Sequence, residues 1–349
     1  MKMKKIKTLG SSNNRGEVTG IVFLGGGQLL RKACLRAKLM NFEIKVITSK
    51  RQSIEFVNNE MLVDFLIQND ISYCLTDEIR SKAVERFLGN SSRFVFLSIG
   101  APWKFKLNEI KFVFEDRLFN LHGSRLPQNR GGGGFSWQIL MGNKFGFCAI
   151  HRVSETIDEG EIIAIDEFLF PAQLRKPIEF ENFYVEKNLN FLSDFFEKLR
   201  ANFAITPIKQ SEYFSTYWPR LNTEINGWIN WTLEPIDLEK FICAFDEPYA
   251  GALTMLNENK VRIKEVCLSP QDGYFHPFQS GIIYRKSKSW ICVAIHGSTL
   301  VIEKLYDNAG RNILDSVNIG DRFFTPHYHL DTSLERVFYN SKSLKKRAD

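Results

Sequence analysis

The sequence predicts an α/β domain built on a doubly wound, mostly parallel sheet, followed by a small β-barrel. Buried apolar strands alternate with amphipathic helices in the first half, and glycines stand where the first strand turns into a helix. After residue 226 the pattern changes to short alternating strands separated by turn residues, which is typical of a barrel. With 349 residues, the chain is long enough for two domains.

The first domain begins with a strand, a glycine turn, a helix and a second strand. The run GIVFL stops at Gly25, Gly26 and Gly27, a helical spacing follows, and EIKVITS reads as the next strand. This order is that of a βαβ unit. Further strands are expected in RFVFLSIG, RLFNLHGS and GFCAIHRVS, and helices in EMLVDFLIQND and in residues 179–203.

The glycine turn lacks the full dinucleotide-binding fingerprint. Leu30 stands where the third glycine belongs, and Ser49 and Lys50 stand where an acidic residue would end the second strand. We therefore expect Gly25 and Gly26 to let backbone amides face a bound substrate.

The positions of proline and glycine residues, which interrupt helices and strands, predict the domain boundaries. We expect a tail at residues 1–16, the first domain at 17–205, a connection at 206–226, the barrel domain at 227–332 and a second tail at 333–349. Within the barrel domain, one helix near residues 236–245 should precede five short strands.

Composition argues against several classes of protein. The net charge is +6, partly from the tails MKMKKIK and SLKKRAD, and no basic stripe with interleaved aromatics suggests a nucleic-acid surface. The six cysteines form no CxxC pair, which disfavours a zinc ribbon or a disulfide scaffold. No run approaches the roughly 18 apolar residues of a membrane helix. We expect a cytoplasmic protein with no membrane partner.

The stretch FNLHGSRLPQNRGGGG presents polar side chains at alternate positions of a strand. Asn120, His122 and Ser124 share one face. Such a face could simply be exposed at a sheet edge, but ligands of open α/β sheets bind at the carboxyl ends of strands. The next strand leads into a turn with Asp158 and Glu159. Amide, imidazole and carboxylate groups together suit acyl transfer to an amine. The spacing of the histidines predicts no metal site.

These residues resemble the signature of the folate-dependent formyltransferases. That family carries N-L-H-x-S-x-L-P-x-x-R-G and then I-D-x-G, which Asn120 to Gly131 and Ile157 to Gly160 match. The resemblance implies that Asn120, His122 and Asp158 are catalytic and that 10-formyltetrahydrofolate is the formyl donor; with the histidine spacing, we expect no metal as cofactor. The stretch GWINWTLEPIDLEKF is similar to the start of the family's C-terminal domain, a barrel like an oligonucleotide-binding fold.

The resemblance also implies where the two substrates bind. LSIGAPWKF stands where the family carries the loop that binds the pterin. Folate contacts are therefore expected at Ser98, Ile99, Gly100, Ala101, Val153, Glu155 and Thr156. Contacts with the formyl acceptor are expected at Gly25, Gly26, Ser124, Arg125, Arg130, Gly131, Tyr217, Trp218 and Arg220.

Two amines fit a two-domain member of this family. A charged tRNA needs a basic surface around the site, and positive charge is not concentrated there. Tyr217, Trp218 and Arg220 suit a base and a diphosphate, although packing of the connection explains them equally well. The expected substrate is therefore a nucleotide-linked amino sugar, formylated as a surface-polysaccharide precursor in lipopolysaccharide biosynthesis. The alternatives are a methionyl-tRNA formyltransferase and an inactive ligand-binding module; a homodimer stays open.

Overall fold

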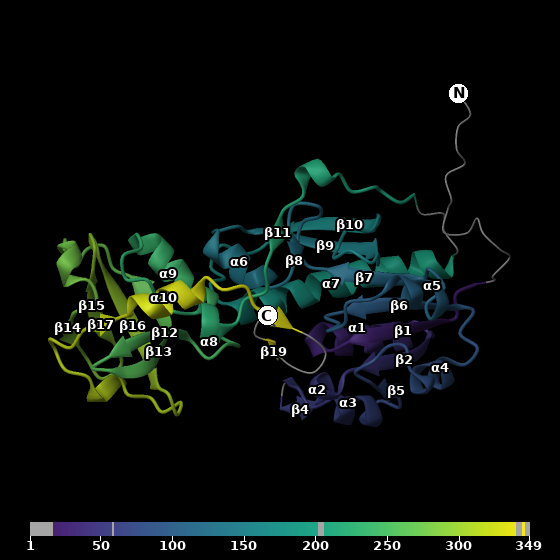
Figure 1. The fold of residues 1–349 in the computed structure, drawn as a ribbon, viewed down its shortest axis with the longest axis horizontal. Coiled ribbons are helices and arrows are strands. Elements are labelled where there is room, and N and C mark those ends of the chain that lie inside the picture. Colours follow the sequence, from purple (N-terminus) through teal and green to yellow (C-terminus); the bar gives the residue numbers. More distant parts are fainter. Residues whose placement is uncertain (1–16, 58, 202–205, 340–343, 346–349) are drawn as a thin grey trace.

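The computed structural model describes residues 17–57, 59–201, 206–339 and 344–345, which form an α/β body and a smaller β body (Figure 1). The expected tail at residues 1–16 lies outside this part of the chain. Within the described ranges, no helix combines the length and apolar character needed to cross a membrane.

The α/β body contains a seven-stranded mixed sheet in the order β10-β9-β7-β6-β1-β2-β5. The five strands from β7 to β5 are parallel, whereas β9 and β10 run antiparallel to their neighbours. The bounds are β1 Gly20–Gly25, β2 Glu43–Thr48, β5 Ser72–Leu75, β6 Phe94–Ile99, β7 Leu118–His122, β9 Phe145–Arg152 and β10 Ile162–Leu169. A small hairpin joins β3 Phe56–Val57 to β4 Glu60–Met61.

Helices cover both faces of this sheet, which makes the body doubly wound. Ile21 and Phe23 of β1 belong to the core that includes α1 and α7, and Val22 and Leu24 belong to the core that includes α4 and α5. Burial on both faces explains why β1 is apolar throughout. The helices are α1 Gly27–Leu39, α2 Lys50–Ser53, α3 Leu62–Gln68, α4 Lys82–Leu88, α5 Leu107–Phe112, α6 Gly134–Leu140 and α7 Pro177–Arg200.

Strand β7 obeys the same two-residue period. Phe119 and Leu121 are buried in the core shared with α7. In this core the ring centroids of Phe119 and Phe195 lie 6.4 Å apart, and those of Phe195 and Phe196 lie 6.3 Å apart. Asn120 and His122 must therefore project from the opposite face of the sheet. Burial of two apolar residues thus fixes the direction of two polar ones.

The smaller body is an antiparallel six-stranded sheet in the order β14-β15-β16-β13-β12-β17. Its edges meet, because the Phe323 N–H donates to the Gly281 carbonyl at 2.9 Å and the Ile283 N–H donates to the Asp321 carbonyl at 2.8 Å. This agrees with the predicted small barrel. Its elements are α9 Pro235–Ala244, β12 Ala252–Leu256, β13 Asn259–Leu268, η2 Pro277–Gln279, β14 Ile283–Lys286, β15 Ile291–Ile295, β16 Ser298–Asp307, η3 Leu314–Ser316 and β17 Phe323–Phe324.

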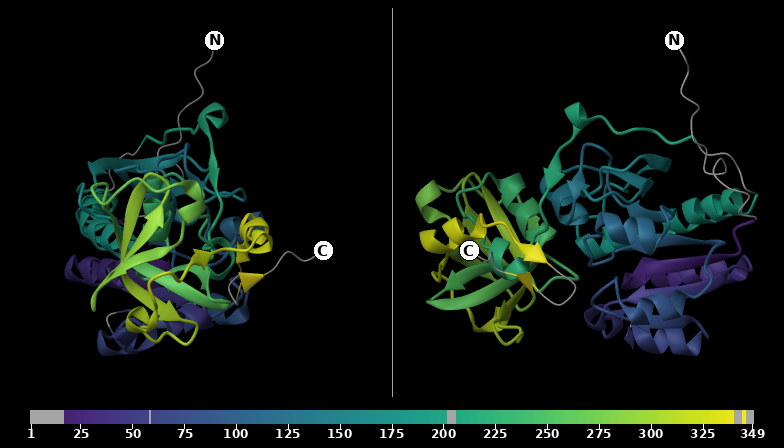
Figure 2. Two further views of the ribbon diagram at one scale, coloured as in Figure 1. Left: turned by 90° about the vertical axis from the view of Figure 1, so that its left-hand side faces the viewer. Right: turned by 45° about the vertical axis from the view of Figure 1, so that its right-hand side comes forward.

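The connection between the bodies lies against the first of them (Figure 2). It contains η1 Glu212–Phe214, β11 Tyr217–Trp218 and α8 Thr223–Asn226, and β11 pairs in parallel with β8 Arg130–Gly131. After the barrel come α10 His327–Ser333, β18 Phe338–Tyr339 and β19 Leu344–Lys345. The described part of the stretch expected as a tail from residue 333 contains β18 and β19, which pair with each other.

Gly25 offers a test of how closely β1 and β6 approach at their carboxyl ends. At its φ of +127° a side chain is strained, and a Cβ would lie 2.1 Å from the Ile99 carbonyl oxygen. We expect Gly25→Ala to lower the free energy of unfolding by at least about 2 kcal/mol in urea titrations. The control is Gly134→Ala in α6, where a Cβ meets nothing within 4 Å and a gain of up to about 1 kcal/mol is expected. Equal stability of the two variants would contradict this account.

Candidate active site

A cavity of about 540 Å³ opens on the face of the sheet that carries Asn120 and His122. This volume lies within the range of small-molecule sites. Predicted site residues that line it are Ser98, Gly100, Ala101, Asn120, His122, Gly131, Val153, Glu155, Thr156, Asp158, Tyr217 and Arg220. Ser98 of β6 pairs with Asn120 of β7, so the two strands present these side by side.

Asp158 reaches the cavity through the connection between β9 and β10. Strand β9 is antiparallel to β7 and pairs Asn120 with His151, so it runs away from the carboxyl end of β7. The connection that follows β9 brings Asp158 Oδ2 back to 3.7 Å from His122 Nδ1. Two features allow this fold: Asp158 has a φ of 56°, and Gly160 approaches the Arg152 carbonyl so closely that a Cβ would lie 1.8 Å from it.

The hydrogen bonds of His122 place a hydrogen on Nε2. His122 Nε2 lies 2.9 Å from the Asn129 carbonyl oxygen and 2.8 Å from Ser124 Oγ. A carbonyl only accepts, and the Ser124 hydroxyl already donates to this same carbonyl at 2.6 Å. Nε2 must therefore donate, and in the neutral ring Nδ1 carries the lone pair. That Nδ1 lies 3.7 Å from Asp158 Oδ2.

Asn120 is oriented in a similar way by His151. His151 Nδ1 lies 2.8 Å from the Arg152 carbonyl oxygen, so this nitrogen donates. In the neutral ring His151 Nε2 is then an acceptor, and Asn120 Nδ2 lies 3.1 Å from it. The amide nitrogen of Asn120 thus faces His151 and has a second hydrogen to offer to a ligand.

Asp158 lies between the two imidazoles. Its Oδ1 is 3.4 Å from His151 Nε2, and its Oδ2 accepts a hydrogen bond from the Gly131 N–H at 2.9 Å. Burial disfavours the charged form of Asp158. The positive charge of the His122 and His151 rings when these are protonated, together with the hydrogen bond from the Gly131 N–H, outweighs burial and holds the pKa of Asp158 well below its usual range. The carboxylate is therefore ionised at neutral pH.

Arg130 holds this turn from behind and does not line the cavity, contrary to its predicted substrate contact. Its guanidinium is buried and donates to Glu212 at 2.8 and 3.0 Å and to Gln210 Oε1 at 3.1 and 3.2 Å. Gln210 Nε2 in turn donates to the carbonyl oxygens of Asp158 at 2.8 Å and Gly160 at 2.7 Å. Because its donors are used inside the protein, Arg130 positions the connection and the Asp158 turn.

Six other predicted contacts also lie outside the cavity lining: Gly25, Gly26, Ile99, Ser124, Arg125 and Trp218. Gly26 donates its N–H to the Ile99 carbonyl at 3.2 Å, so the glycine turn packs against the loop after β6. The Ser124 hydroxyl forms hydrogen bonds with His122 Nε2 and with the Asn129 carbonyl oxygen. The Arg125 guanidinium lies over the Phe147 ring at 5.8 Å. Trp218 is buried beside Trp137. This is the packing role that the sequence left open as the alternative to a substrate contact.

Several residues of the site were missed from sequence. They are Trp103, Lys104, His151, Gln210, Arg336, Val337 and Phe338. Trp103 and Lys104 lie in the loop that follows β6, which ends at Ile99, so their place near a strand's carboxyl end was a usable signal. His151 required the β7–β9 register, and Gln210 and the C-terminal residues carry no local pattern that predicts their position.

The spacing of the histidines in the sequence predicts no metal site, yet the structure brings His122 and His151 together. Metal-ligating atoms of His122, His151 and Asp158 all lie within 4.8 Å of one another, as β9 pairs beside β7. This set of donors could hold a metal ion. The absence of a metal from the reaction stays a prediction.

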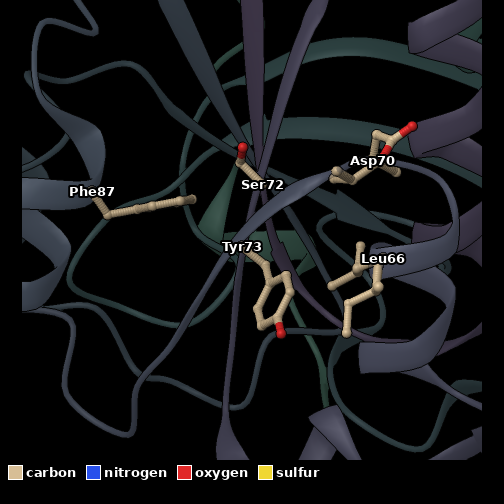
Figure 3. A pocket seen from close by; sticks show the side chains of 7 residues that line it. Leu66, Asp70, Ser72, Tyr73 and Phe87 are labelled. Carbon is tan, nitrogen blue, oxygen red and sulfur yellow. The ribbon is translucent and has the colours of Figure 1, made fainter.

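A second hollow of about 550 Å³ lies at the edge strand β5 (Figure 3). Asp70, Ile71 and Ser72 place it at the amino end of β5, opposite the end at which parallel sheets bind ligands. Its other lining residues are Leu66, Ile67, Tyr73 and Phe87. These side chains offer no arrangement of acid, base and oxyanion donor.

Part of the chain resembles a known protein family. Residues 222–319 match the family described as formyl transferase, C-terminal domain. A methionyl-tRNA formyltransferase of Clostridium perfringens is 28% identical over 186 residues, which cover 53% of this chain and 58% of that protein. The chain thus spans a little over half the length of this relative.

Two solved structures share the fold. WlaRD, a sugar 3N-formyl transferase solved in the presence of dTDP and 5-N-formyl-THF, has a TM-score of 0.60 at 21% identity, covering 82% of this chain and 98% of that one. The N-formyltransferase from Helicobacter canadensis, in complex with folinic acid and dTDP-3-aminofucose, has a TM-score of 0.62 at 18% identity, covering 81% and 98%.

The low pKa of Asp158 predicts a pH-dependent contribution to stability. The ionised carboxylate stabilises the folded protein above the unfolded pKa of about 3.9, and this contribution is lost as the pH falls through the lower folded-state pKa. We expect Asp158→Asn to be less stable than wild type by about 1 to 3 kcal/mol at pH 7, with the difference narrowing toward pH 3. Urea unfolding across this range measures it. Glu155→Gln, on the same turn but exposed, is the control; a difference that does not change with pH would contradict the prediction.

Proposed function

Because the chain belongs to the folate-dependent formyltransferase family, we propose that it transfers a formyl group from 10-formyltetrahydrofolate to an amine. One observation carries this proposal: the Asn120 amide, the His122 imidazole and the ionised Asp158 carboxylate meet on one wall of a single cavity. In such a transfer the amine nitrogen bonds to the formyl carbon, the bond from that carbon to the folate nitrogen breaks, the amine loses a proton, and the folate nitrogen takes one up. The site must therefore accept a proton and stabilise a developing negative oxygen.

His122 is suited to accept the proton. Its Nε2 hydrogen is engaged by the Asn129 carbonyl, so the lone pair on Nδ1 is the basic position. A proton taken up there produces an imidazolium next to the Asp158 carboxylate, 3.7 Å away. Attraction between these opposite charges stabilises the protonated ring, and Gly131 and Gln210 keep the carboxylate and its turn in place.

Asn120 is suited to stabilise the formyl oxygen. His151 holds the amide nitrogen of Asn120 on one side, at 3.1 Å, and is itself buried and fixed by the Arg152 carbonyl. The remaining amide hydrogen is a neutral donor that needs no reorganisation as charge develops, which is the basis of oxyanion stabilisation.

The two walls of the cavity suggest how it is divided between donor and acceptor. We assign the folate to the wall formed by the β6 loop, with Ser98, Gly100 and Ala101, and by the turn after β9, with Val153, Glu155 and Thr156. Trp103 adds a large ring to this wall and is fixed by donation of its Nε1 hydrogen to the Asp77 carbonyl at 3.2 Å. The amine substrate then lies toward Gly131, Tyr217 and Arg220.

We propose a nucleotide-linked amino sugar as the amine. Tyr217 and Arg220 line the cavity and offer a ring face and a guanidinium, which suit a base and a diphosphate. The fold relatives solved with dTDP and with dTDP-3-aminofucose support this substrate class. The product would serve surface-polysaccharide synthesis. Methionyl-tRNA is the second candidate, because the curated relative in Clostridium perfringens is a methionyl-tRNA formyltransferase.

Substitution of the two central residues tests the assigned chemistry. We expect His122→Ala to lower kcat by about 10² to 10⁴, since the proton acceptor is lost. Asn120→Ala should lower it by about 10² to 10³, since an oxyanion donor is lost. Formyl transfer is assayed at saturating donor, with melting temperatures to verify folding and His276→Ala, an exposed barrel histidine, as the control. Turnover near the wild-type level in either active-site variant would refute the mechanism.

The choice of amine is tested with two substrates at two salt concentrations. We expect turnover of members of a panel of nucleotide-linked amino sugars, with a shallow salt dependence. A complex held by tRNA phosphates would weaken steeply, with a slope of about −0.9 for each phosphate neutralised on duplex regions. Efficient formylation of methionyl-tRNA without turnover of any sugar would replace this proposal by the second candidate. Folate binding without transfer to either substrate would indicate a binding module.

A further inference from the structure

The chain that follows the barrel returns to the cavity of the first body. Arg336, Val337 and Phe338 line this cavity together with Tyr217 of β11. No sequence pattern indicated this, because the C-terminal stretch resembles a charged, solvated end. The cavity therefore has a wall supplied by a segment more than 100 residues away from the catalytic strands.

Several contacts hold this returning segment in place. Asn226 of α8 donates from Nδ2 to the carbonyl oxygens of Ser333 at 2.7 Å and Glu335 at 3.1 Å. The rings of Trp228 and His329 stack with centroids 3.6 Å apart. Val337 is only 6% exposed, so the segment also has an apolar anchor beside the cavity. The wall is thus built into the fold.

Arg336 is held by two aromatic rings. Its guanidinium carbon lies 5.1 Å from the centroid of the Tyr217 ring and 4.9 Å from that of the Phe338 ring, and one guanidinium nitrogen donates to the Tyr217 hydroxyl at 3.3 Å. Rings that contact the guanidinium orient it but do not neutralise its charge. Its further N–H groups can serve an oxygen ligand.

No carboxylate in the described part of the chain forms an ion pair with Arg336. Arg130, by comparison, is matched by Glu212 and Glu159. An exposed arginine that is fixed by rings, faces a cavity and lacks an acidic partner is a site for an anionic group.

We propose that Arg336, held by Tyr217 and Phe338, binds a phosphate of the nucleoside diphosphate part of the amine substrate. This inference rests on the proposed function and adds a residue that recognises the substrate. The position of the segment supports the acceptor rather than the folate, because it contacts Tyr217 on the wall formed by β8 and β11. The C-terminal segment then selects substrates that carry a phosphate at this distance from the amine.

Calorimetric titration with dTDP and with UDP tests the inference on the full chain. We expect Arg336→Ala to raise the Kd for the nucleotide that binds wild type by about tenfold or more. Arg336→Lys should fall between the two, because lysine keeps the charge and loses the planar fork. The matched control is Arg311→Ala, which removes an arginine that is 81% exposed on the barrel. In the transfer assay, Arg336→Ala should raise the KM for the amino-sugar nucleotide and leave kcat and the folate KM close to wild type.

The possible failures are distinguishable. Nucleotide affinity that is unchanged in Arg336→Ala, with a folded protein, overturns this inference alone. A raised folate KM with unchanged nucleotide affinity also overturns it and places the segment on the folate side. If the wild-type chain binds neither dTDP nor UDP, and formylates methionyl-tRNA instead, the substrate proposal and this inference fail together.

Discussion

Burial of one face of β7 is the constraint on which the site depends. Phe119 and Leu121 are committed to the core beneath α7, so the alternation of a strand leaves Asn120 and His122 no other direction than the cavity. A shift of one residue in register would bury the polar pair and expose the apolar one. The same hydrophobic contacts that stabilise the domain therefore aim the amide and the imidazole.

A second constraint fixes the carboxylate. Asp158 sits on a connection between two strands, where a short chain has many conformations, yet its turn is held at both ends. Gly131 donates to the side chain, and Gln210 donates to the backbone on either side of Glu159. Arg130 joins Gln210 to Glu212, so a buried guanidinium transmits the position of the connection to the site. Because these polar groups are hydrogen-bonded to one another, few other conformations of the turn are favourable.

The sequence predicted the parts of this protein that depend on local pattern. The apolar period gave both domain types, and the spacing of Asn120 and His122 gave their shared face. It did not predict the antiparallel β9, since an apolar strand reads alike in either direction, nor the role of His151 that follows from the register. Arg130 appeared to be a substrate ligand because its burial and its partners in the connection come from tertiary structure. Arg336 and Phe338 were invisible for the same reason.

The return of the chain from the barrel has a consequence for how the protein could be divided. Two chain segments join the two bodies. Residues 217–226 lead from the rim of the cavity into the barrel, and residues 333–338 return from the barrel to that rim. The barrel is in effect a long closed loop inserted into one wall of the site. Its outer turns, such as the one between β14 and β15, lie outside the lining of the cavity. The two crossings supply part of that lining, so a first domain cut off at residue 201 is an incomplete site.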